Sequence, residues 1–239
     1  MTVYERLRLA IEREERAVLL TVVDGEPLGA KTLVVGDDVR GDGPAELAVG
    51  ARTGLVEHEG RKLFVEVFGP PPKLVVLGAV DVAESLCALA GGIGWRTVVA
   101  DTRAKLATRE RIPSADELLV GWPDDVLERI GLDSDSAVVV LTHDEKLDTP
   151  ALLAALRSQA FYVGALGSRR AQASRRERLL EAGLDEADVD RVSGPCGLDL
   201  GASTSPETAL SILAEAVAIR AGRSGGRLAA STGRIHAEA

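Results

Sequence analysis

Residues 73–86 (KLVVLGAVDVAESL) constrain the fold of this chain more than any other stretch. Five mostly apolar residues end at Gly78, and a helix-forming run follows at once. A strand, a glycine turn and a helix in this order open nucleotide-binding α/β domains. The dinucleotide fingerprint needs glycine at its first, third and sixth positions, with alanine tolerated at the sixth. Gly78, Val80 and Ala83 occupy those positions. The frame is therefore present, but the phosphate-binding turn is altered.

After residue 73 the sequence alternates apolar segments with helix-forming segments. We expect strands at 74–77, 97–100, 116–120, 137–141 and 161–165, and helices at 81–90, 123–130, 149–158, 169–182 and 205–220. Ser168 is the expected cap of the fourth helix, and Pro150 the expected first position of the third. This alternation predicts an α/β, Rossmann-like domain, a parallel sheet with helices on both faces. Right-handed crossovers give it the strand order 3-2-1-4-5.

The first 68 residues predict a small α+β domain. Thr2 and Glu5 form a capping-box pattern at the start of a helix that we expect to reach about Arg16. Apolar segments at 17–23, 31–35 and 61–68 predict strands. The prolines at 70–72 form a stiff segment that no helix or sheet can cross. We therefore expect domains at 1–68 and 73–222, a linker at 69–72 and a flexible tail at 223–239.

Charge and cysteine usage narrow the function classes. The formal net charge of −9 argues against nucleic acid and anionic membranes as partners. Cys87 and Cys196 form no C-x-x-C motif, so we expect reduced thiols rather than a disulfide framework or a zinc site. No apolar run approaches the roughly 18 residues needed to span a bilayer, and the N-terminal segment lacks a signal-peptide core. A cytoplasmic protein is expected.

Four segments are expected to converge on one ligand site. In an open parallel sheet, ligands bind beyond the carboxyl ends of the strands, at the switch point between the first and fourth strands. The segments are the turn at Gly78, Asp101–Arg103, Thr142–Asp144 and Gly164–Arg170. Asp101 follows Gly78 at nearly the usual offset of the ribose-binding acid, about 20 residues. An acid that only ends a strand is an equal alternative.

The segment Thr142–Asp144 carries the candidates for acid–base chemistry. The imidazole of His143 can donate a hydrogen bond, accept one or bind a metal. Asp144 can orient that imidazole or act as an acid or base itself. These two residues are the catalytic candidates. The alternative is that both satisfy backbone groups of the loop.

The segment Gly164–Arg170 (GALGSRR) joins a strand to a helix N-terminus through two glycines. Free backbone amides, the helix dipole, Ser168, Arg169 and Arg170 together suit an anion. Three further arginines continue the basic face of this helix: Arg175, Arg176 and Arg178. The alternative is a solvated helix whose charges are unrelated. In contrast, Asp81 places a negative charge where the Gly78 turn would receive a phosphate.

A long loop rich in turn-forming residues spans 193–205. Cys196 lies there between Pro195 and Gly197, outside any periodic pattern that would place it in the core. A packed or inert thiol is the favoured interpretation, and an exposed thiol that carries sulfur or binds a metal is the alternative. Cys87, on the helix after Gly78, is expected in the core.

These segments resemble the XdhC/CoxI family, the accessory factors of xanthine dehydrogenase and carbon monoxide dehydrogenase. The matching blocks are VVLTHD at 139–144, FYVGALGSRR at 161–170, GPCGLDLGA at 194–202 and ETALSILAE at 207–215. The resemblance covers about residues 70–235 in the same order. It implies a Rossmann-type second domain and a protein that is often dimeric.

The resemblance also implies a function. The family is thought to bind molybdenum cofactor (molybdopterin), protect it during sulfuration and deliver it to a molybdenum hydroxylase. The implied partners are a hydroxylase apo-enzyme, a cysteine desulfurase and a second copy of the chain. The cofactor-binding residues carried over are Gly164, Gly167, Ser168, Arg169 and Arg170 for the phosphate; Thr142, His143 and Asp144 for the pterin or the metal-dithiolene edge; and Asp199, Gly201 and Ala202, with Cys196, on the far side.

The chain departs from the family pattern in two places. The N-terminal segment, which is Gly-rich and contains a cysteine in the family, reads AVGART at 48–53, and one turn of the second domain is altered. The family usually reads GAGHVA where this chain has GAVDVA at 78–83. Two alternatives to a non-catalytic maturation factor therefore stay open. One is an NAD(P)-dependent oxidoreductase that uses Asp101 and His143, with Gly78 and Arg103 as further cofactor-binding candidates. The other is an assembly partner that binds only a hydroxylase subunit.

Overall fold

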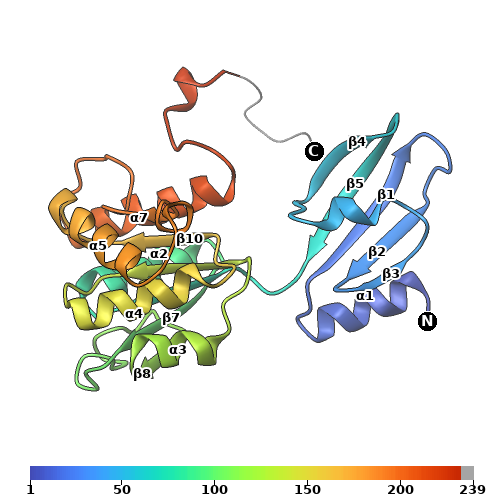
Figure 1. Ribbon diagram of the computed structural model, residues 1–239. Coiled ribbons are helices and arrows are strands. Elements are labelled where there is room, and N and C mark those ends of the chain that lie inside the picture. Colours follow the sequence, from blue (N-terminus) through green and yellow to red (C-terminus); the bar gives the residue numbers. More distant parts are fainter. Residues whose placement is uncertain (233–239) are drawn as a thin grey trace. The chain divides into compact units, whose positions relative to one another are not determined.

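The computed structural model describes residues 1–232, which form two compact units (Figure 1). The larger unit is Pro71–Gly226, and the smaller holds Met1–Pro70 with the described residues from Arg227 onward. Each unit has its own sheet and core. Residues 233–239 of the expected tail lie outside the described part. Within that part, no helix combines the length and the apolar composition that crossing a membrane requires.

The smaller unit is a five-stranded antiparallel sheet with one α-helix. Its elements are α1 (Val3–Glu12), β1 (Ala17–Asp24), β2 (Lys31–Val35), β3 (Asp38–Arg40), η1 (Ala45–Ala48), β4 (Gly54–His58) and β5 (Arg61–Phe68), with the sheet order β3-β2-β1-β5-β4. The Thr2–Glu5 capping box is confirmed. The helix ends before Arg16 because Glu14 adopts a left-handed backbone, with φ of 54°. Neither β3 nor β4 was among the expected strands.

The larger unit contains a six-stranded parallel sheet. Its strands are β6 (Lys73–Leu77), β7 (Arg96–Asp101), β8 (Glu117–Val120), β9 (Ser136–Val140), β10 (Tyr162–Ala165) and β11 (Val192–Ser193). Their order is β11-β10-β9-β6-β7-β8. The predicted Rossmann-like fold and the order 3-2-1-4-5 are therefore confirmed, and β11 is an additional edge strand beside β10.

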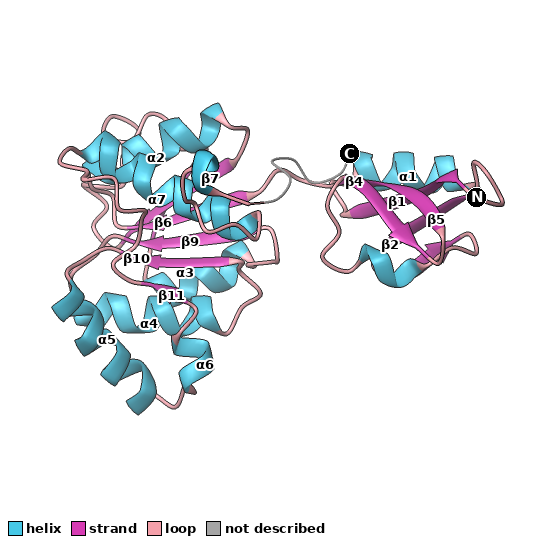
Figure 2. Ribbon diagram, turned by 90° about the horizontal axis from the view of Figure 1, so that it is seen from above, coloured by secondary structure: helices cyan, strands magenta, loops and turns pink. Residues whose placement is uncertain are grey.

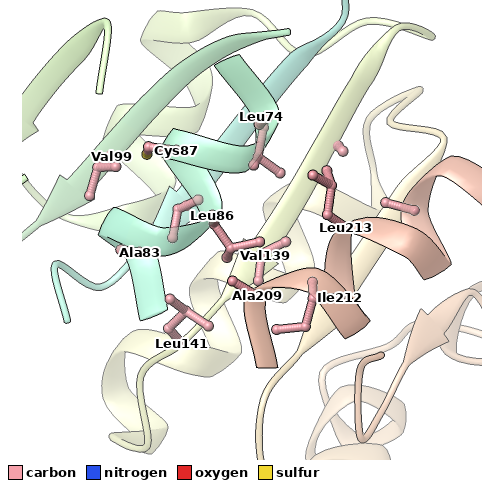
Figure 3. Close-up of a cluster of buried hydrophobic side chains, with 14 of the residues drawn as sticks. Leu74, Ala83, Leu86, Cys87, Val99, Val139, Leu141, Ala209, Ile212 and Leu213 are labelled. Atoms are coloured by element: carbon pink, nitrogen blue, oxygen red, sulfur yellow. The ribbon is translucent and has the colours of Figure 1, made fainter. Parts of the chain in front are cut away.

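Helices cover both faces of this sheet (Figure 2). One face carries α2 (Asp81–Gly92) and α7 (Ser205–Arg220), and the other carries α3 (Pro123–Ile130), α4 (Glu145–Leu156), α5 (Arg169–Glu181) and α6 (Glu186–Val189). Successive residues of a strand face opposite sides, so Val139 packs in one cluster and Val138 in the other. Figure 3 shows Val139 between Leu86 of α2 and Ile212 of α7. Cys87 lies in this core, as predicted.

The start of α4 differs from the expected one. The helix begins at Glu145 rather than Thr149, because Oδ1 of Asp144 accepts a hydrogen bond from the Lys146 amide at 3.0 Å. Pro150 then lies inside the helix, where its missing N–H removes one intrahelical hydrogen bond. A good capping residue thus overrides the proline signal. Asp144, which the sequence predicted as an acid–base residue, therefore sets the start of α4.

Candidate functional site

The turn after β6 packs against the loop after β9. Gly78 has a φ of 113°, a conformation that requires glycine. A Cβ there would come within 3.2 Å of Thr142 Cγ2 and 3.4 Å of Leu141 Cβ. Two of the four expected segments therefore meet at the switch point of the sheet. The absence of a side chain at Gly78 therefore lets the turn after β6 approach the loop after β9 closely.

The Asp101 carboxylate is held by four hydrogen bonds. Oδ2 accepts from the Ala79 amide and from Nη2 of Arg103, and Oδ1 accepts from the amide and Nε of Arg103, all at 2.9 Å. Burial raises the pKa of Asp101, but these hydrogen bonds outweigh burial, so the pKa lies below its usual value. With its side chain 2% exposed and its acceptors used, Asp101 ties β7 to the turn after β6.

The same turn offers few free amides to a pyrophosphate. The Ala79 amide is used by Asp101, and the Val80 amide donates to the Gly78 carbonyl at 3.0 Å. Asp81 is exposed on the first turn of α2, with Arg111 Nη2 at 3.7 Å from its carboxylate. The Ala79 and Val80 amides and the Asp101 carboxylate, which a dinucleotide would need, thus already make hydrogen bonds within the protein. This geometry favours Asp101 as a structural residue.

A cavity of about 310 Å³ lies between α4 and α5, next to the ends of β9 and β10. Its lining residues are His143, Glu145, Asp148, Ser168, Arg170, Ala171, Ser174, Arg175 and Arg178. The structure thus brings His143 together with Ser168 and Arg170, which come from two separate predicted segments. Three arginines face two carboxylates in this cavity, so its lining favours an anion.

A buried ion pair forms the base of the cavity. Nη2 and Nε of Arg175 lie 2.8 and 3.2 Å from Oδ2 of Asp148, and both side chains are less than 5% exposed. The Thr142 hydroxyl donates to Oδ1 of the same carboxylate. Nη2 of Arg175 also donates to the Leu166 carbonyl at 2.8 Å. The loop after β9, α4 and α5 are therefore fixed relative to one another by one polar network.

Sequence reasoning missed part of this cavity. It did not single out Glu145, Asp148 or Ser174, and it placed Arg175 and Arg178 only on a general basic face. A signal was available, because each helix carries two like charges three residues apart. In the structure these charges pair between the helices: Asp148 with Arg175 and Glu145 with Arg178, at 2.9 Å for the second pair.

Several predicted site residues have structural roles that the sequence did not reveal. Ser168 caps α5 through the Ala171 amide at 3.2 Å, as expected. Gly164 is buried within β10, and a Cβ there would lie 2.6 Å from Tyr162 Oη. Its glycine therefore makes room for the tyrosine ring. Outside the cavity lining, six candidates are exposed: Arg103, Asp144, Arg169, Asp199, Gly201 and Ala202.

Cys196 is buried, as the packed-thiol interpretation predicts, and the alternative of an exposed thiol is wrong. Its side chain packs in the α2–α7 core cluster and the residue is 9% exposed. Its amide donates to the Ala165 carbonyl at 3.1 Å, which pins the loop to the end of β10. Burial, with the nearby Glu215 charge, raises the pKa of the thiol to about 12. A neutral buried thiol is a weak nucleophile and metal ligand. Residues 1–232 contain no cluster of three metal-ligating side chains.

Fold and cavity together define a Rossmann-type domain with an anion-favouring cavity at the carboxyl edge of its sheet. More specifically, residues 74–216 match the family model described as the XdhC Rossmann domain, and the chain belongs to this family. The matched range covers the parallel sheet and most of α7. The resemblance drawn from the sequence is confirmed.

Similar proteins agree with this assignment. A protein of Bacillus subtilis (strain 168), named as a probable subunit of xanthine dehydrogenase, is 30% identical over 158 residues, which are 66% of this chain and 46% of that protein. The molybdenum cofactor insertion chaperone PaoD of Escherichia coli (strain K12) is 28% identical, over 64% of this chain and 42% of PaoD. The chain thus spans less than half the length of these relatives.

A solved structure shares the fold. The crystal structure of a protein from Bacillus halodurans, described as a xanthine dehydrogenase, superposes with a TM-score of 0.65. The match covers 95% of this chain and 65% of that one, at 24% sequence identity. It supports the arrangement of elements described above.

Proposed function

We propose that this protein is a non-catalytic accessory factor that binds molybdenum cofactor and delivers it to a molybdenum hydroxylase. Membership of the XdhC family supports the proposal, as do the names of its relatives, which refer to xanthine dehydrogenase and to a cofactor insertion chaperone. The redox chemistry belongs to the cofactor in its destination enzyme. This chain binds the cofactor, orients it and limits its contact with water.

The cavity between α4 and α5 is the single observation that carries the proposal. The cofactor is a pterin with a terminal phosphate, so its site must supply fixed positive donors next to a polar loop. Arg170 and Arg175 supply such donors, and His143 faces the same space. Thr142 is tied to the base of the cavity through Asp148, which holds the loop after β9 beside this space, and we assign the pterin edge to that loop. The residues present therefore fit the group.

Anaerobic binding of purified cofactor to the protein tests the proposal. Arg170→Ala and His143→Ala should each weaken binding, the first by about 10- to 100-fold because a hydrogen bond to a charged group is lost. Arg169, to which the resemblance gave a phosphate contact, does not line the cavity and is left out of the proposed site. Arg169→Ala is therefore the matched control, with the same charge change on the neighbouring exposed residue. Equal losses in all three variants, or no binding by the wild type, would reject this site.

Capture of a hydroxylase polypeptide separates delivery from simple assembly. A delivery factor should bind the apo-enzyme more tightly when loaded, and the cofactor should be found in the hydroxylase afterwards. An assembly partner would bind equally well without cofactor and transfer nothing. The same capture, repeated with a cysteine desulfurase, tests the second proposed partner. Sedimentation of the purified chain tests the proposed homodimer.

A further inference from the structure

One donor of the buried arginine has no acceptor. The other side of the Arg175 guanidinium is used by Asp148 and by the Leu166 carbonyl. Nη1 is buried and finds no hydrogen-bond partner among residues 1–232. Buried polar groups are nearly always paired, because an unpaired donor loses its hydration without compensation. An acceptor supplied by a ligand would complete this guanidinium.

Glycine leaves a space beside that donor. A Cβ at Gly167 would lie 3.3 Å from Nη1 of Arg175 and 3.4 Å from Cβ of Ala171. Any side chain at this position would therefore fill the space next to the unpaired N–H. Ala171 and Arg175 both line the cavity, so the space belongs to its wall. Gly167 also has a φ of 146°, which a side chain rarely adopts.

Charge pairing leaves the cavity positive. Its two carboxylates are already neutralised, Asp148 by Arg175 and Glu145 by Arg178. Arg170 remains exposed at the rim. The N-terminus of α5, where Ser168 accepts from the Ala171 amide, adds the positive end of the helix dipole at the same place. An anion would thus meet donors at the base and at the rim.

We infer that the cavity between α4 and α5 is a binding site for a terminal phosphate monoester, with Nη1 of Arg175 as its buried donor. A monoester offers three terminal oxygens and two negative charges, enough for the base and the rim together. A phosphodiester offers only two terminal oxygens and one charge. The inference deepens the proposed function. It rests on that function only for the identity of the molecule that carries the phosphate group.

Asp148 is a positioning residue in this site. It accepts from Nε and Nη2 of Arg175, and the Thr142 hydroxyl fixes the other carboxylate oxygen. This pairing turns Nη1 toward Gly167. Rotation of the guanidinium away from Asp148 would leave a buried charge unpaired, so the orientation is held before any ligand arrives.

Titration of the full chain with inorganic phosphate, followed by phosphorus NMR at an ionic strength of about 0.15 M, tests the inference. Arg175→Lys keeps the charge beside Asp148 and removes Nη1, and it should weaken phosphate binding at least tenfold. Arg170→Ala alters an exposed residue and should weaken binding without affecting the fold. Arg169→Ala, the matched control, should stay within about twofold of the wild type. Dimethyl phosphate should bind more weakly than phosphate.

Distinct results overturn the inference and the proposed function. Absence of saturable phosphate binding at millimolar concentration, or equal weakening by all three substitutions, would overturn the phosphate site. Circular dichroism shows whether the Arg175→Lys protein folds. If it does not fold, the phosphate affinities of Arg170→Ala and Arg169→Ala alone test the site. Phosphate binding that survives in a protein unable to bind molybdenum cofactor would reject the proposed function and leave the phosphate site standing.

Discussion

Oδ2 of Asp101 accepts a hydrogen bond from the Ala79 amide at 2.9 Å, which ties the end of β7 to the turn after β6. This acid stands where a dinucleotide-binding domain holds the ribose. Here it has Arg103 as its partner instead. Asp101 therefore stabilises the contact between β7 and the turn after β6, and its protonation changes the free energy of unfolding.

Asp101→Asn should lower the free energy of unfolding at neutral pH and should also make that free energy depend less on pH. A carboxyl group whose pKa is lowered in the folded chain adds stability above its unfolded value, and that stability is lost as pH falls through the folded pKa. We expect Asp101→Asn to cost about 2 kcal/mol at neutral pH. Its unfolding free energy should then fall less than that of the wild type below about pH 4. Urea denaturation across this range measures both effects, and parallel curves would contradict the assignment.

Restoring the fingerprint glycine should not create a dinucleotide site. Val80→Gly removes the β-branched side chain, but the Ala79 amide and the Asp101 carboxylate remain committed to each other. We expect neither the wild type nor this variant to bind NAD(H) or NADP(H) with micromolar affinity in a fluorescence titration. Tight binding by Val80→Gly would revive the oxidoreductase alternative.

Both cysteines should be unreactive in the folded protein. Burial raises the pKa of Cys87 and of Cys196 to about 12. At about pH 8 only one thiol in roughly ten thousand is then ionised, and only the thiolate reacts. A disulfide reagent should label neither residue until urea is added. Ala202→Cys, exposed in the same loop as Cys196, should react within seconds to minutes. Rapid labelling of the wild type would show that this loop opens.

The sheet could be predicted from the sequence because its signals are local and mutually consistent. Alternating segments and right-handed crossovers fix the strand order, and side-chain caps such as Ser168 mark helix starts. The short strands β3 and β4 lack such a signal. Cys196 lies in a loop without periodicity, so only the tertiary fold shows that it is buried.

The cavity was harder to predict because two helix faces build it. Motif reading concentrates on loop glycines, whereas the buried charges stand one or more turns into α4 and α5. The pairing of Asp148 with Arg175 depends on how those helices pack. Residues in the loops, such as His143 and Ser168, were found because the ends of parallel strands share one edge.

The buried ion pair should show strong non-additivity. Asp148→Ala leaves the Arg175 charge buried and unpaired, and should cost about 3–5 kcal/mol of unfolding free energy. Asp148→Leu combined with Arg175→Met replaces both charges by apolar groups and should cost far less than either single change. Chemical denaturation of the singles and the double measures the coupling. Additive losses would mean that the two side chains do not pair in solution.

Gly164 was predicted to bind a ligand, but the structure shows that its lack of a side chain makes room for Tyr162. A Cβ at Gly164 would lie 2.6–2.8 Å from three atoms of Tyr162, whose hydroxyl donates to Oε2 of Glu215 at 2.6 Å. Gly164→Ala must therefore displace a buried ring that is held at its far end. We expect a loss of about 1–3 kcal/mol in unfolding free energy.

Gly91→Ala is the matched control for this substitution. Gly91 lies in α2, and a Cβ there would meet no atom within 4 Å, so the change should stabilise the protein by about 0.5–1 kcal/mol. Thermal and urea unfolding of both variants gives the comparison. A stable Gly164→Ala protein that has lost phosphate binding would return Gly164 to the ligand site. A destabilised one that still binds phosphate would confirm that this glycine serves the Tyr162 ring.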